Sequence, residues 1–316
     1  MALNADKPHL WKADIAASVD HFNRWFMRFA PKAYRTTRVQ TTERVKEALL
    51  KSKDLRDLSP DLLRKHPEVL VTLRMATAPP IARDRLIGLA GTTSNLVHRM
   101  EDGNLPKRMA STELTGSLGR ICKVLTELLD RDIFPWLEGG KRPTELERDR
   151  ASTIVADRLC GAIADPIVRN SQEQRQLELV ETFLEKRGYR RKQHGGGRPI
   201  VEMELGTFAF RLNLVVGQAK KVNIPIDVVI QPKKPRPGRM PILIEAKSAG
   251  DFTNTNKRRK EEATKIHQLR SAYGKDTQLI LFLCGYFDSG YLGYEAAEGL
   301  DWVWEHRIED LLELGL

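Results

Sequence analysis

The stretch Pro241-Ile242-Leu243-Ile244-Glu245-Ala246-Lys247-Ser248 decides the fold of this chain, because two charged residues interrupt an apolar run. Such a run predicts a buried β-strand, in which successive side chains point to opposite faces. Glu245 and Lys247 therefore share one face, and Ile244 and Ala246 share the other. Burial alone would favour Val or Leu at both charged positions. The pattern indicates that this strand carries chemistry.

A second carboxylate lies upstream, on a segment that also predicts a strand. Val222 to Ile230 alternates in the same way, with Asp227 opposite its apolar residues. Antiparallel pairing through the Pro- and Lys-rich turn at 231–239 would bring Asp227 beside Glu245. Two carboxylates suit Mg²⁺, which prefers oxygen ligands and can neutralise charge on a phosphodiester. Lys247 would then contact the attacking water or the scissile phosphate. The alternative is an exposed Glu-Lys pair on an edge strand.

The formal charge of +10 gathers around these residues. From Lys186 to Arg270 there are 20 Lys/Arg against 7 Asp/Glu, whereas from Ser271 to Leu316 there are 2 against 9. Clustered positive charge is typical of a surface that binds a polyanion, and nucleic acid is the partner we expect. A membrane surface fits less well, because the cations do not follow one amphipathic helix. We expect no membrane association.

Three cysteines, an odd number without metal-ligand spacing, favour buried thiols in a reducing compartment over disulfides or a zinc site. The chain also begins without a basic-then-apolar leader, and its longest apolar run is too short to cross a bilayer. We expect a cytoplasmic protein.

Two regions are expected along the chain. Residues 1–150 read as short helices punctuated by prolines. One helix is expected to stop before Pro31, another to begin with Ser59 as its cap, and one element is predicted over 81–100. Together they would form an N-terminal helical region that supports DNA binding or dimerisation. Residues 151–316 form the catalytic region. Here a helix at 151–164 is expected to stop before Pro166, and a second helix follows at 171–186. Strands at 208–216, 222–230 and 242–248 come next, then a helix at 256–272 and a strand at 278–284. This order predicts a mixed α/β (α+β) fold with an αβββαβ core.

The helix before the strands offers one more acidic residue. At 100° per residue, Glu173 falls on the stripe that Leu177, Val180 and Leu184 define, whereas Glu178 lies off it. Glu173 is therefore a candidate metal ligand, directly or through water. The alternative is that an acid in a first helical turn is favoured by the unpaired amides there.

Two basic segments are candidates for DNA contacts. One leaves the strand of Glu245 and opens the following helix, where four consecutive cations oppose the helix dipole unless phosphate is their partner. The other is a glycine-rich segment that could clamp the duplex. The candidate residues are Asn254, Asn256, Lys257, Arg258, Arg259 and Lys260 in the first segment, and Arg190, Arg191, Lys192 and Arg198 in the second.

Asp227, the Glu245-Ala246-Lys247 strand and Glu173 on the preceding helix resemble the PD-(D/E)XK nuclease superfamily, although the proline stands at position 225, two residues before the aspartate. The segments 170–176 and 300–307 resemble type II restriction endonucleases, and 73–85 resembles the XamI group of those enzymes. This resemblance implies a restriction-endonuclease-like core and Mg²⁺-dependent double-strand cleavage within a short palindrome by a homodimer. It also implies a cognate DNA methyltransferase as a genetic partner, and GTCGAC as a candidate target.

We therefore expect a site-specific DNA endonuclease in which Asp227, Glu245 and the carbonyl of Ala246 hold Mg²⁺ and Lys247 orients or activates water. One alternative is a repair or recombination nuclease of the same fold. The other is a non-catalytic DNA-binding protein, in which the Glu245-Ala246-Lys247 pattern would be incidental.

Overall fold

The computed structural model describes residues 3–194, 199–217, 221–234, 240–253 and 255–316. The chain forms two compact units, one made of Met1–Phe29 with Arg169–Leu316 and the other of Ala30–Val168. The sequence predicts one boundary near residue 150 instead. The first residues of the chain thus belong to the same unit as the strands, and the helical unit extends to residue 168.

Two long helices explain this difference, because each continues through a proline at which the sequence predicts a break. They are α1 (Pro8–Lys51), which contains Pro31, and α8 (Glu145–Glu185), which contains Pro166. A proline inside a helix leaves the carbonyl four residues earlier without its usual donor. Those carbonyls belong to Met27 and Ala162, two residues with exposed side chains, where water can bind in place of the lost donor.

The helical unit contains a bundle of short helices around its own hydrophobic core. The predicted start at Ser59 is confirmed, since its hydroxyl accepts a hydrogen bond from the backbone N–H of Leu62 at 3.2 Å. The single element predicted over 81–100 is wrong, because the structure has two helices there. The elements are α2 (Pro60–Lys65), η1 (Pro67–Val69), α3 (Leu70–Met75), α4 (Arg83–Ala90), α5 (Ser94–Glu101), α6 (Ser111–Leu128) and α7 (Trp136–Gly139).

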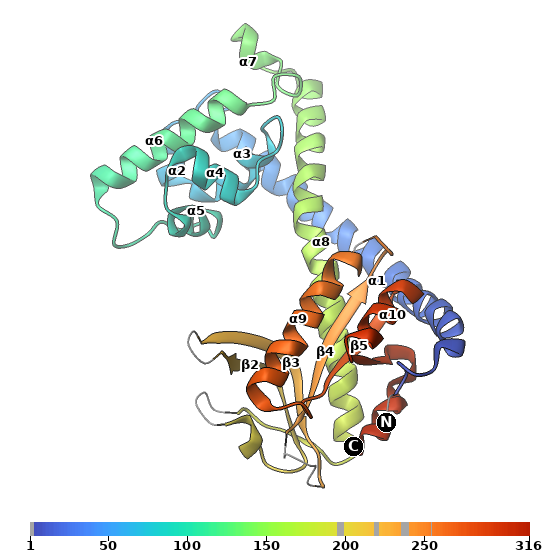
Figure 1. Cartoon of the computed structure of the whole chain (residues 1–316). Helices are drawn as coiled ribbons and strands as arrows, with labels where there is room; N and C mark the ends of the chain where they lie inside the picture. The colour runs from blue at the N-terminus through green and yellow to red at the C-terminus, as the bar shows by residue number, and fades with distance from the viewer. Residues whose placement is uncertain (1–2, 195–198, 218–220, 235–239, 254) are drawn as a thin grey trace. The chain divides into compact units, whose positions relative to one another are not determined.

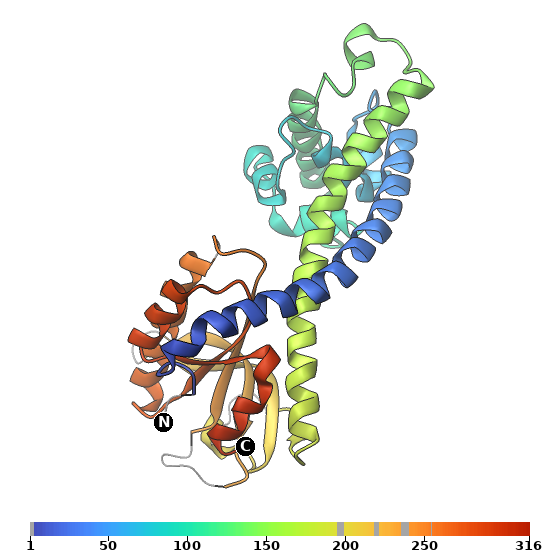
Figure 2. The ribbon, with the colours of Figure 1, turned by 90° about the vertical axis from the view of Figure 1, so that its right-hand side faces the viewer.

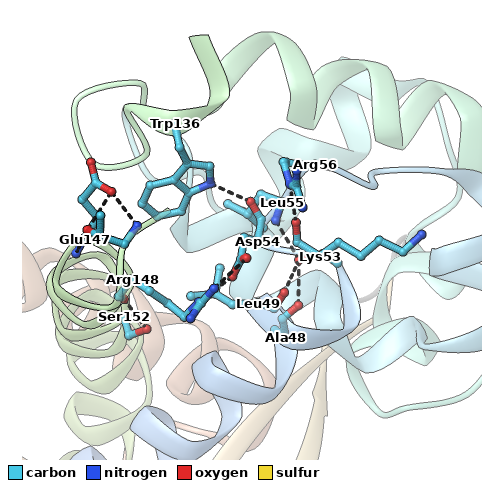
Figure 3. Close-up of polar contacts among 12 residues, drawn as sticks. Ala48, Leu49, Lys53, Asp54, Leu55, Arg56, Trp136, Glu147, Arg148 and Ser152 are labelled. Carbon is cyan, nitrogen blue, oxygen red and sulfur yellow. Dashed lines mark hydrogen bonds and ion pairs between the residues drawn. The ribbon is translucent and has the colours of Figure 1, made fainter. Parts of the chain in front are cut away.

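The end of α1 is fixed in the helical unit by an uncommon turn. Lys53, Asp54 and Leu55 have φ angles of 50°, 59° and 63°, in the left-handed region that residues other than glycine rarely adopt. Figure 3 shows what holds it: the Arg148 guanidinium donates to both Asp54 carboxylate oxygens at 2.8 and 3.0 Å, and the Trp136 indole donates to the Asp54 carbonyl at 2.9 Å. Strained backbone persists where its surroundings determine it in this way.

The other unit is built on one six-stranded sheet whose spatial order follows the chain. Strands β2, β3 and β4 pair antiparallel, whereas β1 with β2, β4 with β5 and β5 with β6 pair parallel. The predicted αβββαβ order is confirmed in α8, β2, β3, β4, α9 and β5. The bounds are β1 (Arg190–Arg191), η2 (Ile200–Glu202), β2 (Thr207–Val216), β3 (Val222–Gln231), β4 (Ile242–Ala249), α9 (Thr255–Tyr273), β5 (Leu279–Gly285), α10 (Ser289–Ala297), β6 (Asp301–Trp304) and η4 (Glu305–Leu314).

Helices cover both faces of this sheet (Figures 1 and 2). The C-terminal part of α8 and η4 bury one face, where Leu177 packs in a cluster with Ile244. On the other face, Ile266 and Leu269 of α9 pack in a cluster with Leu243. Both sides of β4 are therefore closed, so any charged group on it must be paired or functional.

Further core residues follow the sequence-based expectations. Trp302 and Trp304 are completely buried in a cluster with α10, and the thiols of Cys122, Cys160 and Cys284 are buried and free, as the cysteine pattern predicts. Within the described ranges, no helix has the length and apolar character needed to cross a membrane.

Candidate active site

The predicted carboxylates meet where β3 and β4 stop pairing. The last pairs of that ladder are Val228 with Ile244, Val229 with Leu243 and Ile230 with Ile242, so the next position would set Asp227 opposite Glu245. No backbone pair forms there. Instead, a carboxylate oxygen of Asp227 accepts a hydrogen bond from the backbone N–H of Ala246 at 2.8 Å. The strands separate at this point, and the Asp227 side chain replaces a backbone carbonyl as the acceptor for the Ala246 amide.

Glu245 is buried and held by two ammonium groups. Its side chain contacts the Lys247 ammonium at 3.2 Å through one oxygen and the Lys265 ammonium of α9 at 2.6 Å through the other. Glu245 is only 9% exposed, and β4 lies between β3 and β5 inside the sheet. The alternative of an exposed pair on an edge strand is therefore wrong.

Lys247 contacts a third carboxylate, which the sequence analysis missed. The Lys247 ammonium lies 3.0 Å from Glu262 of α9, whose side chain is 1% exposed. Burial lowers the pKa of Lys247, but the carboxylates of Glu245 and Glu262 outweigh that effect, so its pKa is raised above the ordinary value. The ammonium thus stays charged. Helical spacing could have revealed Glu262, which shares an inward stripe with Ile266 and Leu269.

The surroundings of Asp227 disfavour the charged form of its carboxyl group. Burial and the nearby Glu245 raise its pKa to about 6, although the Ala246 amide and Lys247 act in the opposite direction. A divalent cation beside both carboxylates would favour the charged form. Among the described residues, no three His, Cys, Asp or Glu side chains gather closely enough to hold a metal by themselves. Two carboxylates and a backbone carbonyl, completed by water and phosphate, are a donor set that suits Mg²⁺.

Glu173 lies at the edge of the site and not on the buried stripe. The buried face of α8 carries Gln172 and Gln176 there, whereas the Glu173 side chain is 42% exposed and pairs with Arg211 of β2 at 3.0 Å. Glu173 lies off the buried face because α8 packs against the sheet with a small rotation relative to the predicted stripe. Glu173 still raises the pKa of Asp227 through its charge, so the two carboxylates lie within electrostatic range.

Arg211 is a second residue that sequence reasoning missed. Its φ of 53° interrupts a strand, and the pairs Phe210 with Val228 and Leu212 with Ile226 on either side set it across from Asp227. Such backbone outliers gather at functional sites. The strand pattern gives no signal for this conformation, because arginine does not mark left-handed positions as glycine does.

The two segments that resemble restriction endonucleases come together beside the site. From 170–176, Gln176 donates to the carbonyls of Lys247 and Phe282 at 3.4 and 3.1 Å, and Arg175 forms an ion pair at 2.5 Å with Glu305 of 300–307. Gln176 is buried and bridges β4 to β5. These contacts fix the backbone on which Lys247 stands.

The structure describes only part of the predicted DNA-contact set. Arg190 and Lys192 pair with Glu204, and Arg191 pairs with Glu181 at 3.1 Å, all on the surface. Exposed ion pairs of this kind contribute little to stability, so these cations can leave their carboxylates and bind phosphate instead. Lys260 is exposed on α9. Asn256, Lys257, Arg258 and Arg259 lie in α9 with side chains outside the described part, and Arg198 and Asn254 lie outside the described residues.

A buried glutamate behind Lys247 makes a stability prediction. Glu295 of α10 is fully buried, and burial, with Glu262 and Glu298 nearby, raises its pKa from 4.5 to about 8, against the opposing effects of Lys247 and a Tyr291 hydrogen bond. Between pH 4.5 and 8 the folded protein keeps a proton that the unfolded chain releases. Its stability therefore falls as pH rises through that window, by up to about 1.4 kcal/mol per pH unit.

We expect Glu295→Gln to remove this dependence, so that its Tm exceeds the wild-type Tm by a margin that grows from pH 5 to pH 8. Thermal melts at a series of pH values measure the margin. Glu261→Gln, one residue before Glu262 but exposed, should melt in parallel with the wild type. A constant Tm difference for Glu295→Gln across the range would contradict the raised pKa.

Comparison with known proteins places these features in context. The model of the XamI restriction endonuclease family matches residues 53–304. The type II restriction enzyme SalI of Streptomyces albus G is 58% identical over 313 residues, which cover 99% of this chain and 99% of that protein. The crystal structure of protein VC1899 from Vibrio cholerae aligns with 87% of this chain at 11% identity and a TM-score of 0.29, and this chain spans about half (55%) of that one.

Proposed function

The chain belongs to the XamI restriction endonuclease family and is a type II restriction endonuclease, and from that premise we propose that Asp227, Glu245 and Lys247 form its active site. DNA is the substrate, and site-specific cleavage is favoured over the two alternatives, a repair nuclease and a non-catalytic DNA-binding protein. The observation that supports the site is the Asp227–Ala246 hydrogen bond at the point where β3 and β4 separate.

Enzymes of this class generally use a divalent metal, and we propose Mg²⁺. Asp227, Glu245 and the carbonyl of Ala246 would hold it. When bound, such a cation neutralises charge on the phosphodiester and makes water more acidic. The protein itself contributes position: Gln176 fixes the backbone of Lys247, and Lys265 orients Glu245 until metal and substrate arrive.

Lys247 acts in this proposal as a fixed positive charge. Its raised pKa leaves it protonated at neutral pH, so it has no lone pair with which to accept a proton from water. Its ammonium can donate hydrogen bonds to a phosphate oxygen and to the attacking water. Of the two expected roles, orienting water is therefore favoured over activating it by proton removal.

Glu173 remains a proposed metal-shell residue, and one variant pair tests it. We expect Glu173→Gln to raise the Mg²⁺ concentration needed for half-maximal cleavage several-fold, because it removes a charge that acts on Asp227. Glu178→Gln, on the same helix, should leave the requirement unchanged, since Glu178 is exposed and accepts a hydrogen bond from Gln174. Cleavage rates over a Mg²⁺ titration measure this. Identical titrations for both variants would remove Glu173 from the site.

The assembly on DNA follows from the same premise. We propose a homodimer on a palindrome, since two copies related by a two-fold axis cut both strands symmetrically. The cations that open α9 and those from Arg190 to Arg198 would contact phosphates, and a cognate methyltransferase would protect the host DNA in the cytoplasm. GTCGAC is the first target to test.

The decisive experiment is digestion of a sequenced, unmethylated plasmid with the purified protein, with and without Mg²⁺. We expect discrete fragments with Mg²⁺ and intact plasmid without it. Sequencing of the fragment ends gives the target and the stagger. A smear, or cleavage that persists in excess chelator, would contradict a metal-dependent, site-specific enzyme.

A further inference from the structure

The region predicted as one element at 81–100 is a helix, a three-residue turn and a second helix. Helix α4 ends at Ala90, the turn is Gly91-Thr92-Thr93, and α5 begins at Ser94. Gly91 has a φ of 52°, which glycine adopts without strain, and the Thr93 hydroxyl caps α5 by accepting from the Leu96 amide at 3.3 Å. Two short helices joined by a glycine-containing turn are the layout of a helix-turn-helix.

The inner sides of both helices are buried in the core of the helical unit. In α4 these are Leu86 and Ala90, and in α5 they are Leu96, Val97 and Met100, none more than 2% exposed. Ala90, small and next to the turn, lets the two helices approach closely. The element therefore has one fixed inner side.

Polar contacts fix its orientation. Glu101, at the end of α5, pairs with Arg74 of α3 at 2.6 Å and with Arg83 of α4 at 2.5 Å. Arg120 of α6 donates to the Ala90 carbonyl at 2.8 Å and so satisfies the end of α4. These contacts fix α5 against α3 and α4, and α4 against α6, so the outer face of α5 has one position.

The outer face of α5 is polar and exposed. It carries Ser94, Asn95, His98 and Arg99, at the spacing of one helical face. Within the part of the chain that the structure describes, no carboxylate forms an ion pair with the Arg99 guanidinium.

A groove with a volume of about 510 Å³ lies next to the outer face of α5. Asn95 and Arg99 line one side of it, and Lys107 and Arg108, both exposed, line the other. A groove with three cations and one exposed acid, Glu113, is complementary to a polyanion.

We propose that α4 and α5 are a DNA-reading element, with α5 in the major groove, Asn95 and Arg99 on base edges, and Lys107 and Arg108 on phosphates. In such elements the N-terminal residues of the second helix contact bases while the first helix crosses the backbone. Arginine forms two hydrogen bonds with guanine, and asparagine forms two with adenine. This proposal rests on the proposed function, and it assigns part of target recognition to the helical unit.

The test measures binding without cleavage. Full-length protein in chelator is titrated against a duplex that contains its mapped site and against an unrelated duplex of the same length. We expect Arg99→Ala to weaken cognate binding by roughly 5- to 150-fold, the loss of one two-bond base contact, and unrelated binding by less than about 3-fold. Arg150→Ala removes the same charge from an exposed position of α8 and should change neither affinity.

Methylation interference supplies an independent measurement. Methylation of guanine N7 in one position of the target should block wild-type binding, and Arg99→Ala should no longer sense methylation at that guanine. Equal losses on both duplexes would make Arg99 a phosphate contact, and unchanged cognate binding would place α5 away from DNA. If the wild type still cuts plasmid, either result overturns the proposal that α5 reads DNA and leaves the proposed function intact. If the wild type cuts no DNA with divalent metal, the proposed function itself fails.

Discussion

Asp227→Asn is expected to lower the single-turnover cleavage rate by about 10³-fold or more, since it removes one of the two carboxylates proposed to hold the metal and several kcal/mol of charge stabilisation with it. Asparagine can still accept the hydrogen bond from the Ala246 amide, so the local backbone should be kept. The variant should also lose the rise in Tm that Mg²⁺ causes in the wild type, because only a bound metal stabilises the fold.

Without metal, the same variant should be at least as stable as the wild type. The pKa of Asp227 is raised from 3.8 to about 6, so above pH 6 the native state holds an unfavourable charge that asparagine lacks. Melts at pH 8 in chelator and in Mg²⁺ measure both effects. Asp276→Asn, in an exposed loop, is the matched control and should behave as the wild type. An Asp227→Asn protein that keeps its Mg²⁺-dependent rise in Tm would show that the metal binds elsewhere.

The strands and their two acidic residues could be predicted because both signals are local. Alternation within Ile242–Ala249 sets Glu245 and Lys247 on one face, and the few residues between β3 and β4 make antiparallel pairing the simplest arrangement. The register then places Asp227 without further information. Because side chains alternate with a period of two, a one-residue slip would move every side chain to the other face, so register is strongly specified wherever one face is buried.

The residues missed are those whose position depends on tertiary packing. Glu262 and Lys265 reach the site only because α9 crosses back over β4. Helical spacing sets Glu262 on the inward stripe of α9, but it does not fix the angle at which that helix crosses the sheet. Glu173 was predicted on the buried face of α8 but lies at its edge. An angle of 100° per residue gives the relative positions of side chains on one helix, but it does not give the rotation of that helix against the sheet.

Prolines and glycines misled the reading of the helical unit in opposite directions. Pro31 and Pro166 were expected to end helices, but both lie in helices exposed enough for water to replace the lost bond. Gly91 ends helix α4, because it adopts a left-handed conformation there. The helical spacing of apolar residues nevertheless continues past Gly91 into α5. Hydrophobic period alone cannot separate one helix from two that share a core.

Lys247→Ala is expected to lower the single-turnover cleavage rate by about 10²- to 10³-fold, the usual loss when a fixed donor to a developing negative charge is removed. Affinity for the cognate duplex in chelator should change little, because the interaction strengthens mainly in the transition state. Lys275→Ala, which removes an exposed lysine from the same unit, should leave the rate unchanged. Rapid-quench cleavage and anisotropy titrations measure the two quantities.

A less stable protein would also cleave more slowly, and Lys247→Ala could destabilise the fold because Lys247 pairs with the carboxylates of both Glu245 and Glu262. Its removal leaves Glu262, only 1% exposed, without its cation, and an uncompensated buried charge costs about 3–5 kcal/mol. The double variant Lys247→Ala, Glu262→Gln removes that charge as well, so its Tm should recover most of the loss. Its cleavage rate should stay as low as that of Lys247→Ala. If cleavage recovers together with Tm, Lys247 serves the fold and not the reaction.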